Sequence, residues 1–166
     1  MPHRVVCGYD GSPESTAAAR LGAAIGRAVG LDVLLLHVVE QLVDQLESPP
    51  NDVRSQLAQQ RRDRLVRLCG ELGEDATARF EPGDPGAWLL TLAAEQDTDL
   101  MLVGTRGHGA AKALARGSVA RRVAAEACCP VIVVPPEAAA DTRLAELNEA
   151  LVVCGVDDSP EANGAV

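Results

Sequence analysis

The stretch DVLLLHVV, residues 32–39, is apolar at six of its eight positions. Such a run is typical of a strand that is buried on both faces of a parallel sheet. The stretch TDLMLVG (98–104) has the same character. Three further runs are predicted to form strands because they are short, apolar or alternating, and bounded by turn residues. They are RVVCGYD (4–10), ATARFEP (76–82) and CPVIVVPP (129–136).

Helix signals lie between these strands. Ser12-Pro13 and Asp84-Pro85 each place an N-cap residue before a proline, and Gly117-Ser118 opens a later helix. The first helix is expected to end at Gly30. The apolar positions expected to face the core are Leu21, Ile25 and Ala28 in the first helix and Val53, Leu57, Leu65, Leu68 and Leu72 in the second. Strands that alternate with helices predict a doubly wound α/β domain over residues 1–137, with a five-stranded parallel sheet covered by helices on both faces.

Composition narrows the class of protein. The chain has 166 residues, a net charge of −9 and only three aromatic residues, so its core is built from Ala, Val and Leu. An acidic chain argues against a nucleic-acid platform, because phosphate backbones require basic surfaces. No apolar run approaches the roughly 20 residues that span a bilayer, and no secretory leader is apparent. Five cysteines without CxxC spacing predict neither a disulfide framework nor a zinc site, and we expect a cytoplasmic protein.

A glycine-rich, basic stretch follows the fourth predicted strand: GTRGHGAAKALARGSVARR (104–122). It leaves the carboxyl end of that strand, which is where ligands bind in open α/β sheets. Its glycines permit close approach of a ligand to the backbone, and Gly117-Ser118 places free amides at the start of a helix. Residues 100–125 contain five basic residues and no acid. These features favour a polyphosphate ligand, although the spacing G-x2-G-x9-G-S matches neither Walker A nor the dinucleotide fingerprint.

The sequence repeats near its end. VVCGVDDSPE (152–161) matches VVCGYDGSPE (5–14) at eight of ten positions, about one domain length apart. We interpret residues 138–150 as a linker and residues 151–166 as the truncated start of a second copy. This apolar segment is expected to pair with a sheet edge, and a disordered tail is the alternative.

Several motifs resemble those of the universal stress protein family, in particular its ATP-binding subgroup. VVCGYDGSPES resembles the family's first strand and turn, LLLHVV its second strand and FEPGDPGAWLL its third strand and following helix. DLMLVGTRGHG, continued by GSVARRVAAEACCPVIVVP, resembles its phosphate loop and last strand. The resemblance covers residues 3–136 and implies the strand order 3-2-1-4-5. It also implies that Asp10 faces Gly104 across the crevice between the first and fourth strands.

The resemblance assigns expected roles to residues of this chain. Asp10 is expected to bind the ribose hydroxyls, and the alternative is that it only caps the turn before Ser12. His108 either contacts a phosphate or is solvated, and His37 is expected to be a satisfied core histidine. Gly8, Tyr9, Val38, Val39 and Val103 are expected to line an adenine pocket, with plain core packing as the alternative. Gly104, Gly107, Gly117, Ser118 and Val119 are expected to offer donors to the phosphates.

Three classes of function compete. We favour a regulatory protein that uses ATP as a ligand or signal, over an ATP-using enzyme or a dimerisation module that binds no nucleotide. Neither HxGH nor SGGxDS follows the first strand and no catalytic set is recognisable, so no dedicated enzyme is predicted. Slow hydrolysis or autophosphorylation at Ser118 or a neighbouring hydroxyl stays open. Mg²⁺ is expected to arrive with the nucleotide, because few acids lie nearby. In the strand order that the resemblance implies, the last strand, VIVV, is an edge, which predicts a homodimer or pairing of tandem domains.

Overall fold

A computed structural model describes residues 3–39, 51–105 and 117–135, with the side chains of residues 51–55 excepted. Gly107 and His108 lie outside the described residues, as do the predicted linker 138–150 and the repeated segment 151–166. The predictions made for these positions therefore stay predictions.

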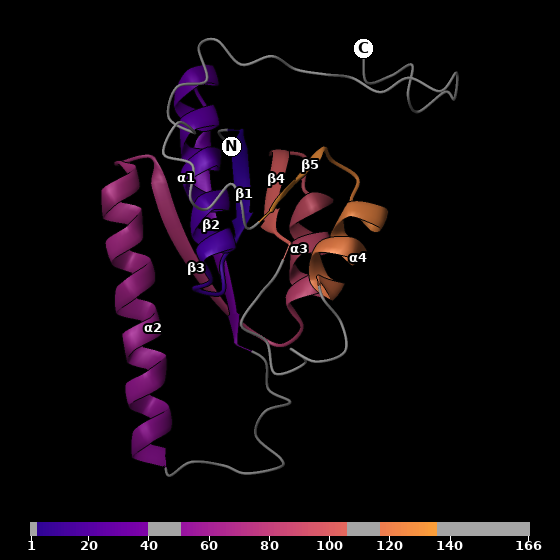
Figure 1. Cartoon of the computed structure of the whole chain (residues 1–166). Helices are drawn as coiled ribbons and strands as arrows, with labels where there is room; N and C mark the ends of the chain where they lie inside the picture. The colour runs from indigo at the N-terminus through magenta and orange to yellow at the C-terminus, as the bar shows by residue number, and fades with distance from the viewer. Residues whose placement is uncertain (1–2, 40–50, 106–116, 136–166) are drawn as a thin grey trace, which may run out of the picture.

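Five parallel strands form one sheet (Figure 1). They are β1 (Arg4–Gly8), β2 (Asp32–Val39), β3 (Ala76–Pro82), β4 (Thr98–Gly104) and β5 (Val131–Val134). Their order is β3-β2-β1-β4-β5, with Cys7 of the central strand paired to Leu35 on one side and Leu102 on the other. The predicted fold class and strand order are confirmed.

Within the described residues, four helices cover the two faces of the sheet. They are α1 (Pro13–Val29), α2 (Asn51–Leu72), α3 (Pro85–Ala93) and α4 (Ser118–Glu126). Alternate strand residues supply the two core layers. Val5, Cys7 and Leu35 pack toward α1 and α2, whereas Val6 and Leu36 pack toward α3 and α4. Side chains of residues that are neighbours in a strand therefore lie on opposite faces of the sheet.

Local capping fixes the ends of the helices as the sequence predicts. The backbone N–H of Ser15 donates to the side chain of Ser12 at 3.1 Å, and that of Ala87 donates to Asp84 at 2.6 Å. A proline follows each cap at the first helical position. Gly30 ends α1 in the left-handed conformation, with φ 75°.

The buried face of α1 differs from the predicted one. Its buried positions are small residues, among them Ala18, Gly22 and Gly26, whereas Ala28 is exposed and Leu21 and Ile25 are only partly buried. A methyl group on Gly22 would lie 2.5 Å from the sulfur of Cys7. Small residues let α1 approach the sheet closely, so the large apolar residues are displaced to the sides of the contact.

The helix α2 follows the prediction only in its second half. Leu65, Leu68 and Leu72 are buried as expected, but Leu57 is 44% exposed. Figure 1 shows the reason, because the first half of α2 extends beyond the carboxyl ends of the strands and has no sheet to cover. None of the described helices is both long and apolar enough to cross a membrane.

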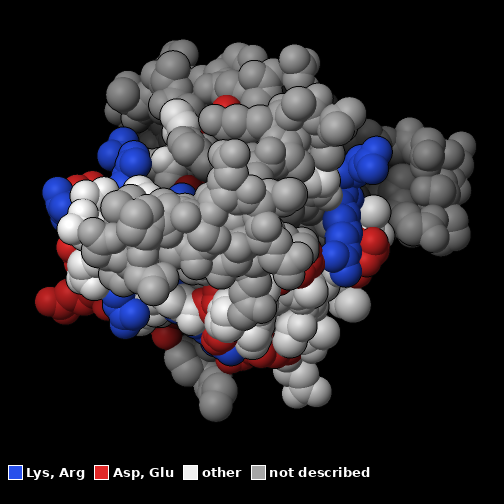
Figure 2. All heavy atoms as spheres, turned by 90° about the horizontal axis from the view of Figure 1, so that it is seen from below, with Lys and Arg blue, Asp and Glu red and all other residues white. Residues whose placement is uncertain are grey.

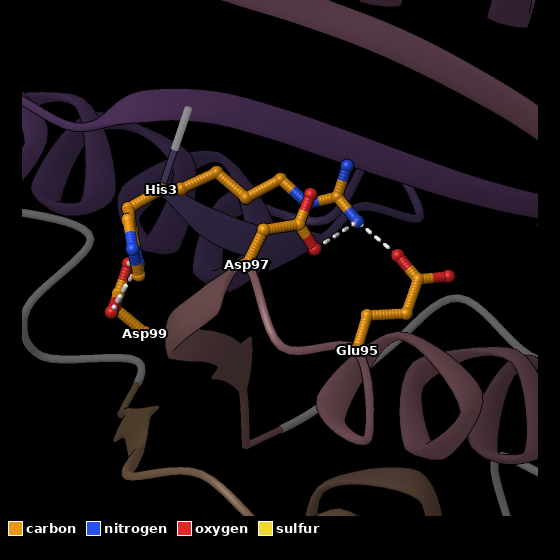
Figure 3. Close-up of polar contacts among 5 residues, drawn as sticks. His3, Glu95, Asp97 and Asp99 are labelled. Atoms are coloured by element: carbon orange, nitrogen blue, oxygen red, sulfur yellow. Dashed lines mark hydrogen bonds and ion pairs between the residues drawn. The ribbon is translucent and has the colours of Figure 1, made fainter. Parts of the chain in front are cut away.

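Ion pairs at the amino edge of the sheet connect β1 and the residue before it to β4 and the segment that precedes β4 (Figure 3). Arg4 pairs with Glu95 and, at 3.3 Å, with Asp97. The ring of His3 lies 2.9 Å from the carboxylate of Asp99. These contacts hold the two central strands together at the end opposite to the predicted site.

Candidate functional site

The direction of winding reverses between β1 and β4. Strand β1 is followed in sequence by β2 on one side, whereas its other neighbour is β4, and ligands of open α/β sheets bind at such a reversal. Gly8 and Gly104 end these two strands. A methyl group on Gly8 would lie 3.3 Å from Val103 and from Leu89, so the floor of this edge is tightly packed.

Asp10 lies just after β1 at this edge. The backbone N–H of Ser12 donates to its Oδ1 at 3.0 Å, so the turn-capping interaction is present. The N–H of Asp10 itself lies 3.4 Å from the hydroxyl of Ser15. A carboxylate has acceptor capacity for about four hydrogen bonds, so capping the turn is compatible with binding a ligand hydroxyl.

The start of α4 supplies backbone donors to the same edge. Gly117 is the N-cap residue in the left-handed conformation, with φ 75°, and among the described residues no side-chain hydrogen bond caps this helix. A methyl group on Gly117 would lie 2.6 Å from the carbonyl oxygen of Thr105, so the start of α4 rests on the end of β4. Ser118 is exposed at the first helical position. Uncapped amides at a helix start favour an anion.

Packing requires a glycine at position 104, in addition to the role in ligand access expected from the sequence. A methyl group there would lie 2.8 Å from Cβ of Glu14 and 3.0 Å from the backbone nitrogen of Ser15. The first turn of α1 therefore fits against the end of β4 only because residue 104 is glycine. Glu14 is the single buried carboxylate in the described part of the chain, and the sequence analysis did not identify it.

The apolar residues expected to line the adenine pocket do not share one face. Val38 and Val103 lie in the core layer under α3 and α4, and Val119 packs against the same layer. The side chain of Tyr9 lies in the opposite layer, 6% exposed, with its ring in an edge contact to His37. Val39 is 44% exposed at the end of β2. The structure therefore brings Val38, Val103 and Val119 together and leaves Tyr9 apart from them.

Four enclosed side-chain polar atoms have no hydrogen-bond partner within the described structure, and two of them belong to His37 and Thr105. The Nδ1 atom of His37 bonds the carbonyl oxygen of Tyr9 at 2.8 Å, but its Nε2 atom is unpaired. His37 is thus buried as predicted, although it is only half satisfied. The Oγ1 atom of Thr105 is also enclosed and unpaired. Thr105 was not singled out by sequence, although its position directly after Gly104 is the signal that would have found it.

Basic side chains gather on two flanks of the carboxyl edge. Figure 2 views the molecule from this edge and shows blue side chains on the side of α4 and on that of α2. On α4, Arg122 pairs with Asp84 at 2.9 Å and with Glu126 at 3.5 Å, which neutralises much of its charge. Arg121 is exposed. No cluster of three metal-ligating side chains is present among the residues that the structure describes.

Comparison with known proteins decides the family. The model of the Universal stress protein family matches residues 1–135. The chain belongs to the universal stress protein family. It is 34% identical over 134 residues to a universal stress protein of Thermus aquaticus, covering 78% of this chain and 96% of the relative. It is also 33% identical over 138 residues to one of Mycolicibacterium smegmatis, where the match covers 80% of this chain but only 45% of the relative.

Solved structures of universal stress proteins share this fold. One that was determined in complex with cAMP superposes with a TM-score of 0.55 at 26% identity, covering 80% of this chain and 96% of that one. A family member from Arabidopsis thaliana with AMP bound gives a TM-score of 0.55 at 23% identity, covering 84% of this chain and 100% of that one.

Proposed function

We propose that this universal stress protein binds an adenine nucleotide at the carboxyl edge between β1 and β4, and that ATP serves there as a ligand or signal. The observation that carries the proposal is the start of α4, which no described side chain caps and which lies against Thr105 directly after β4. Helix amides held at a topological reversal favour a phosphate group.

Each part of a nucleotide finds suitable chemistry at this edge. The carboxylate of Asp10 is suited to the ribose hydroxyls. Val38 and Val103 offer apolar surface for the base on the adjacent face. The amides at the start of α4, the hydroxyl of Ser118 and the unpaired hydroxyl of Thr105 are suited to phosphate oxygens.

The solved relatives support the adenine class of ligand. Their ligands are cAMP and AMP, so ATP as the particular nucleotide rests on the further phosphate-binding capacity expected of the segment 104–122. We propose that Mg²⁺ enters with ATP, held chiefly by the phosphates as such ions are in many nucleotide sites.

We propose a binding role rather than a catalytic one. Regulation by bound nucleotide needs differential affinity between two states and no chemical step. Slow hydrolysis or autophosphorylation is the competing function, and the exposed hydroxyl of Ser118 is its acceptor candidate. Incubation with γ-labelled ATP tests it, because phosphorylation of the wild type that is lost in Ser118→Ala would favour the competing function. A cytoplasmic location is part of the proposal.

Assembly is proposed to use the edge strand β5. This strand pairs only with β4 in the described sheet, and Val133 is 37% exposed. An unpaired apolar edge favours association with a second edge, either of another copy or of a tandem domain. Light scattering across a wide concentration range tests this, and Val133→Lys is expected to shift a dimer toward monomer.

Calorimetric titration with AMP, cAMP and ATP with Mg²⁺ tests the proposed ligand. Asp10→Ala is expected to weaken binding about tenfold, since a charge-assisted hydrogen bond is lost. Asp75→Ala is the matched control, because it removes the same charge from an exposed position just before β3, at the amino edge. No binding by the wild type at millimolar concentration, or equal losses in both variants, would contradict the proposal.

A further inference from the structure

A groove separates α1 from α2 on the face of the sheet away from α3 and α4. It has a volume of about 490 Å³, which is within the range of small-molecule sites. Tyr9, Thr16, Arg20, Arg64 and Arg67 are among its lining residues, and we call it the α1–α2 groove. The function proposed above makes no use of it.

Three arginine residues of the two helices line this groove. Arg64 and Arg67 are three residues apart on α2 and therefore lie on neighbouring turns of one helix face. Arg20 faces them from α1 and follows Thr16 by four residues, which places both on one side of that helix. The buried residues Leu65 and Leu68 hold this part of α2 against the core.

The charges in the groove are unevenly paired. Two carboxylates also line it, but Asp63 accepts a hydrogen bond from Gln59 at 2.8 Å, and Glu71 lies 4.0 Å from Arg20. The side chains of Arg20 and Glu71 are both more than half exposed, so this ion pair is weak. Arg64 and Arg67 contact no carboxylate within the described structure. Two unpaired guanidinium forks therefore face a hollow of ligand size.

Tyr9 adds a second kind of polar group. Its side chain is 6% exposed and lies at the end of β1, where it forms the buried floor of the groove. A buried tyrosine usually has a hydrogen-bond partner for its hydroxyl. Among the hydrogen bonds of the described residues, none involves this hydroxyl, whereas the hydroxyl of Thr16 donates to the carbonyl oxygen of Ser12. Tyr9 is therefore available to a ligand as a donor.

We propose that the α1–α2 groove binds a small phosphate-bearing anion, either inorganic phosphate or a phosphate monoester. Planar guanidinium groups bind phosphate oxygens through pairs of N–H donors, and the tyrosine hydroxyl supplies one more donor. This site is independent of the nucleotide site, because its side chains lie on the face of α1 and α2 and include none of the residues at the start of α4.

Calorimetric titrations with inorganic phosphate and with glycerol 3-phosphate, at low ionic strength, test the proposal. We expect saturable binding that Arg64→Gln and Arg67→Gln each weaken about tenfold. Arg61→Gln is the matched control, since it removes the same charge from an exposed position of the same helix that does not line the groove. Binding in this control should weaken by no more than about twofold, because Arg61 does not line the groove and donates no hydrogen bond to the anion.

A second readout places the bound anion. Tyr9 is the only tyrosine of the chain, so the near-ultraviolet absorption of tyrosine reports on the floor of the groove. We expect it to change on addition of phosphate, with the change lost in Tyr9→Phe. The tighter of the two probes identifies the free ion or the ester as the ligand class.

The same variants are titrated with AMP to separate the two sites. Phosphate binding that depends on Arg64 and Arg67 supports the groove even if AMP does not bind. Absence of saturable phosphate binding, or binding that Arg64→Gln, Arg67→Gln and Arg61→Gln leave equally unchanged, overturns it whatever the result with AMP.

Discussion

The carbonyl oxygen of Thr105 lies 2.6 Å from the position that a methyl group on Gly117 would take. Two residues that are distant in sequence are thereby in backbone contact, and this contact sets the start of α4 against the end of β4. The amides of α4 can be presented at the carboxyl edge only while residue 117 has no side chain and keeps its positive φ. The requirement for glycine at position 117 thus has a geometric cause.

Gly117→Ala is expected to destabilise the fold by roughly 2–3 kcal/mol and to weaken nucleotide binding. The positive φ costs about 1–2 kcal/mol for a residue with a side chain, and the contact with Thr105 adds to it. Urea denaturation and nucleotide titration measure the two effects. Gly30→Ala is the control, because Gly30 has the same φ of 75° but no atom within 4 Å. Equal losses in both variants would show that the contact with Thr105 is unimportant.

Gly22→Ala and Gly70→Ala are expected to change stability in opposite directions. Both residues are inside helices, where alanine is favoured over glycine by roughly 1 kcal/mol. Gly70 has open space around it, so its replacement should stabilise the protein. A methyl group on Gly22 would lie 2.5 Å from the sulfur of Cys7, and overpacking of this kind costs about 1–3 kcal/mol. Stabilisation by Gly22→Ala in urea denaturation would contradict the close packing of α1.

Cys7 is expected to make stability fall at alkaline pH. Burial raises the pKa of its thiol from 9.0 to about 12. Between these values the unfolded chain loses the thiol proton and the folded chain keeps it, so ionisation favours the unfolded state as pH rises. The contribution is about 1.4 kcal/mol per pH unit above pH 9. Urea denaturation between pH 8 and pH 10.5 should show a shallower decline for Cys7→Ala, and an unchanged decline would contradict this assignment.

Glu14→Gln is expected to strengthen ATP binding about threefold and AMP binding less. Glu14 is buried and its Cβ atom lies against Gly104, so a negative charge on this residue opposes the charge of a phosphate chain bound at this edge. The same carboxylate interacts favourably with the start of α1, and its loss should cost about 0.5–1 kcal/mol of stability. Calorimetric titration with both nucleotides checks the prediction. A loss of ATP affinity would instead indicate that Glu14 helps to hold the ligand or its metal ion.

Local signals made much of the fold predictable. Ser12 and Asp84 cap their helices by contacts within three residues, so the sequence around each cap contains the whole interaction. The buried strands β2 and β4 were recognisable because both of their faces are covered and their sequences are mostly apolar. The strand order came from the family resemblance and is confirmed.

The prediction for α2 was wrong at Leu57, because the surroundings of a side chain depend on segments that are distant in sequence. Leu57 was expected to be buried because it continues the apolar pattern of α2, but it belongs to the first half of this helix, which extends beyond the carboxyl ends of the strands. Tyr9 follows Gly8 directly, yet alternation along β1 directs its side chain into the opposite core layer from Val103. Adjacency in the sequence therefore does not show which side chains lie on the same face of the sheet.

The α1–α2 groove was not predictable for a similar reason. The segment QQRRDRLVR (59–67) has the composition of an ordinary solvated helix face. The groove is formed only in the folded protein, where Arg20 of α1 and Tyr9 after β1 line the same hollow as Arg64 and Arg67.

The nucleotide content of the purified protein tests the central claim most directly. The protein is denatured, the supernatant is chromatographed, and the released adenine nucleotide is measured per mole of chain. Protein that releases none is then heated with and without millimolar ATP and Mg²⁺. We predict about one adenine nucleotide per chain, or stabilisation by roughly 2.7 kcal/mol when the added ligand reaches about 100 times its Kd. If the protein releases no nucleotide and added ATP does not stabilise it, these results would contradict a nucleotide site between β1 and β4.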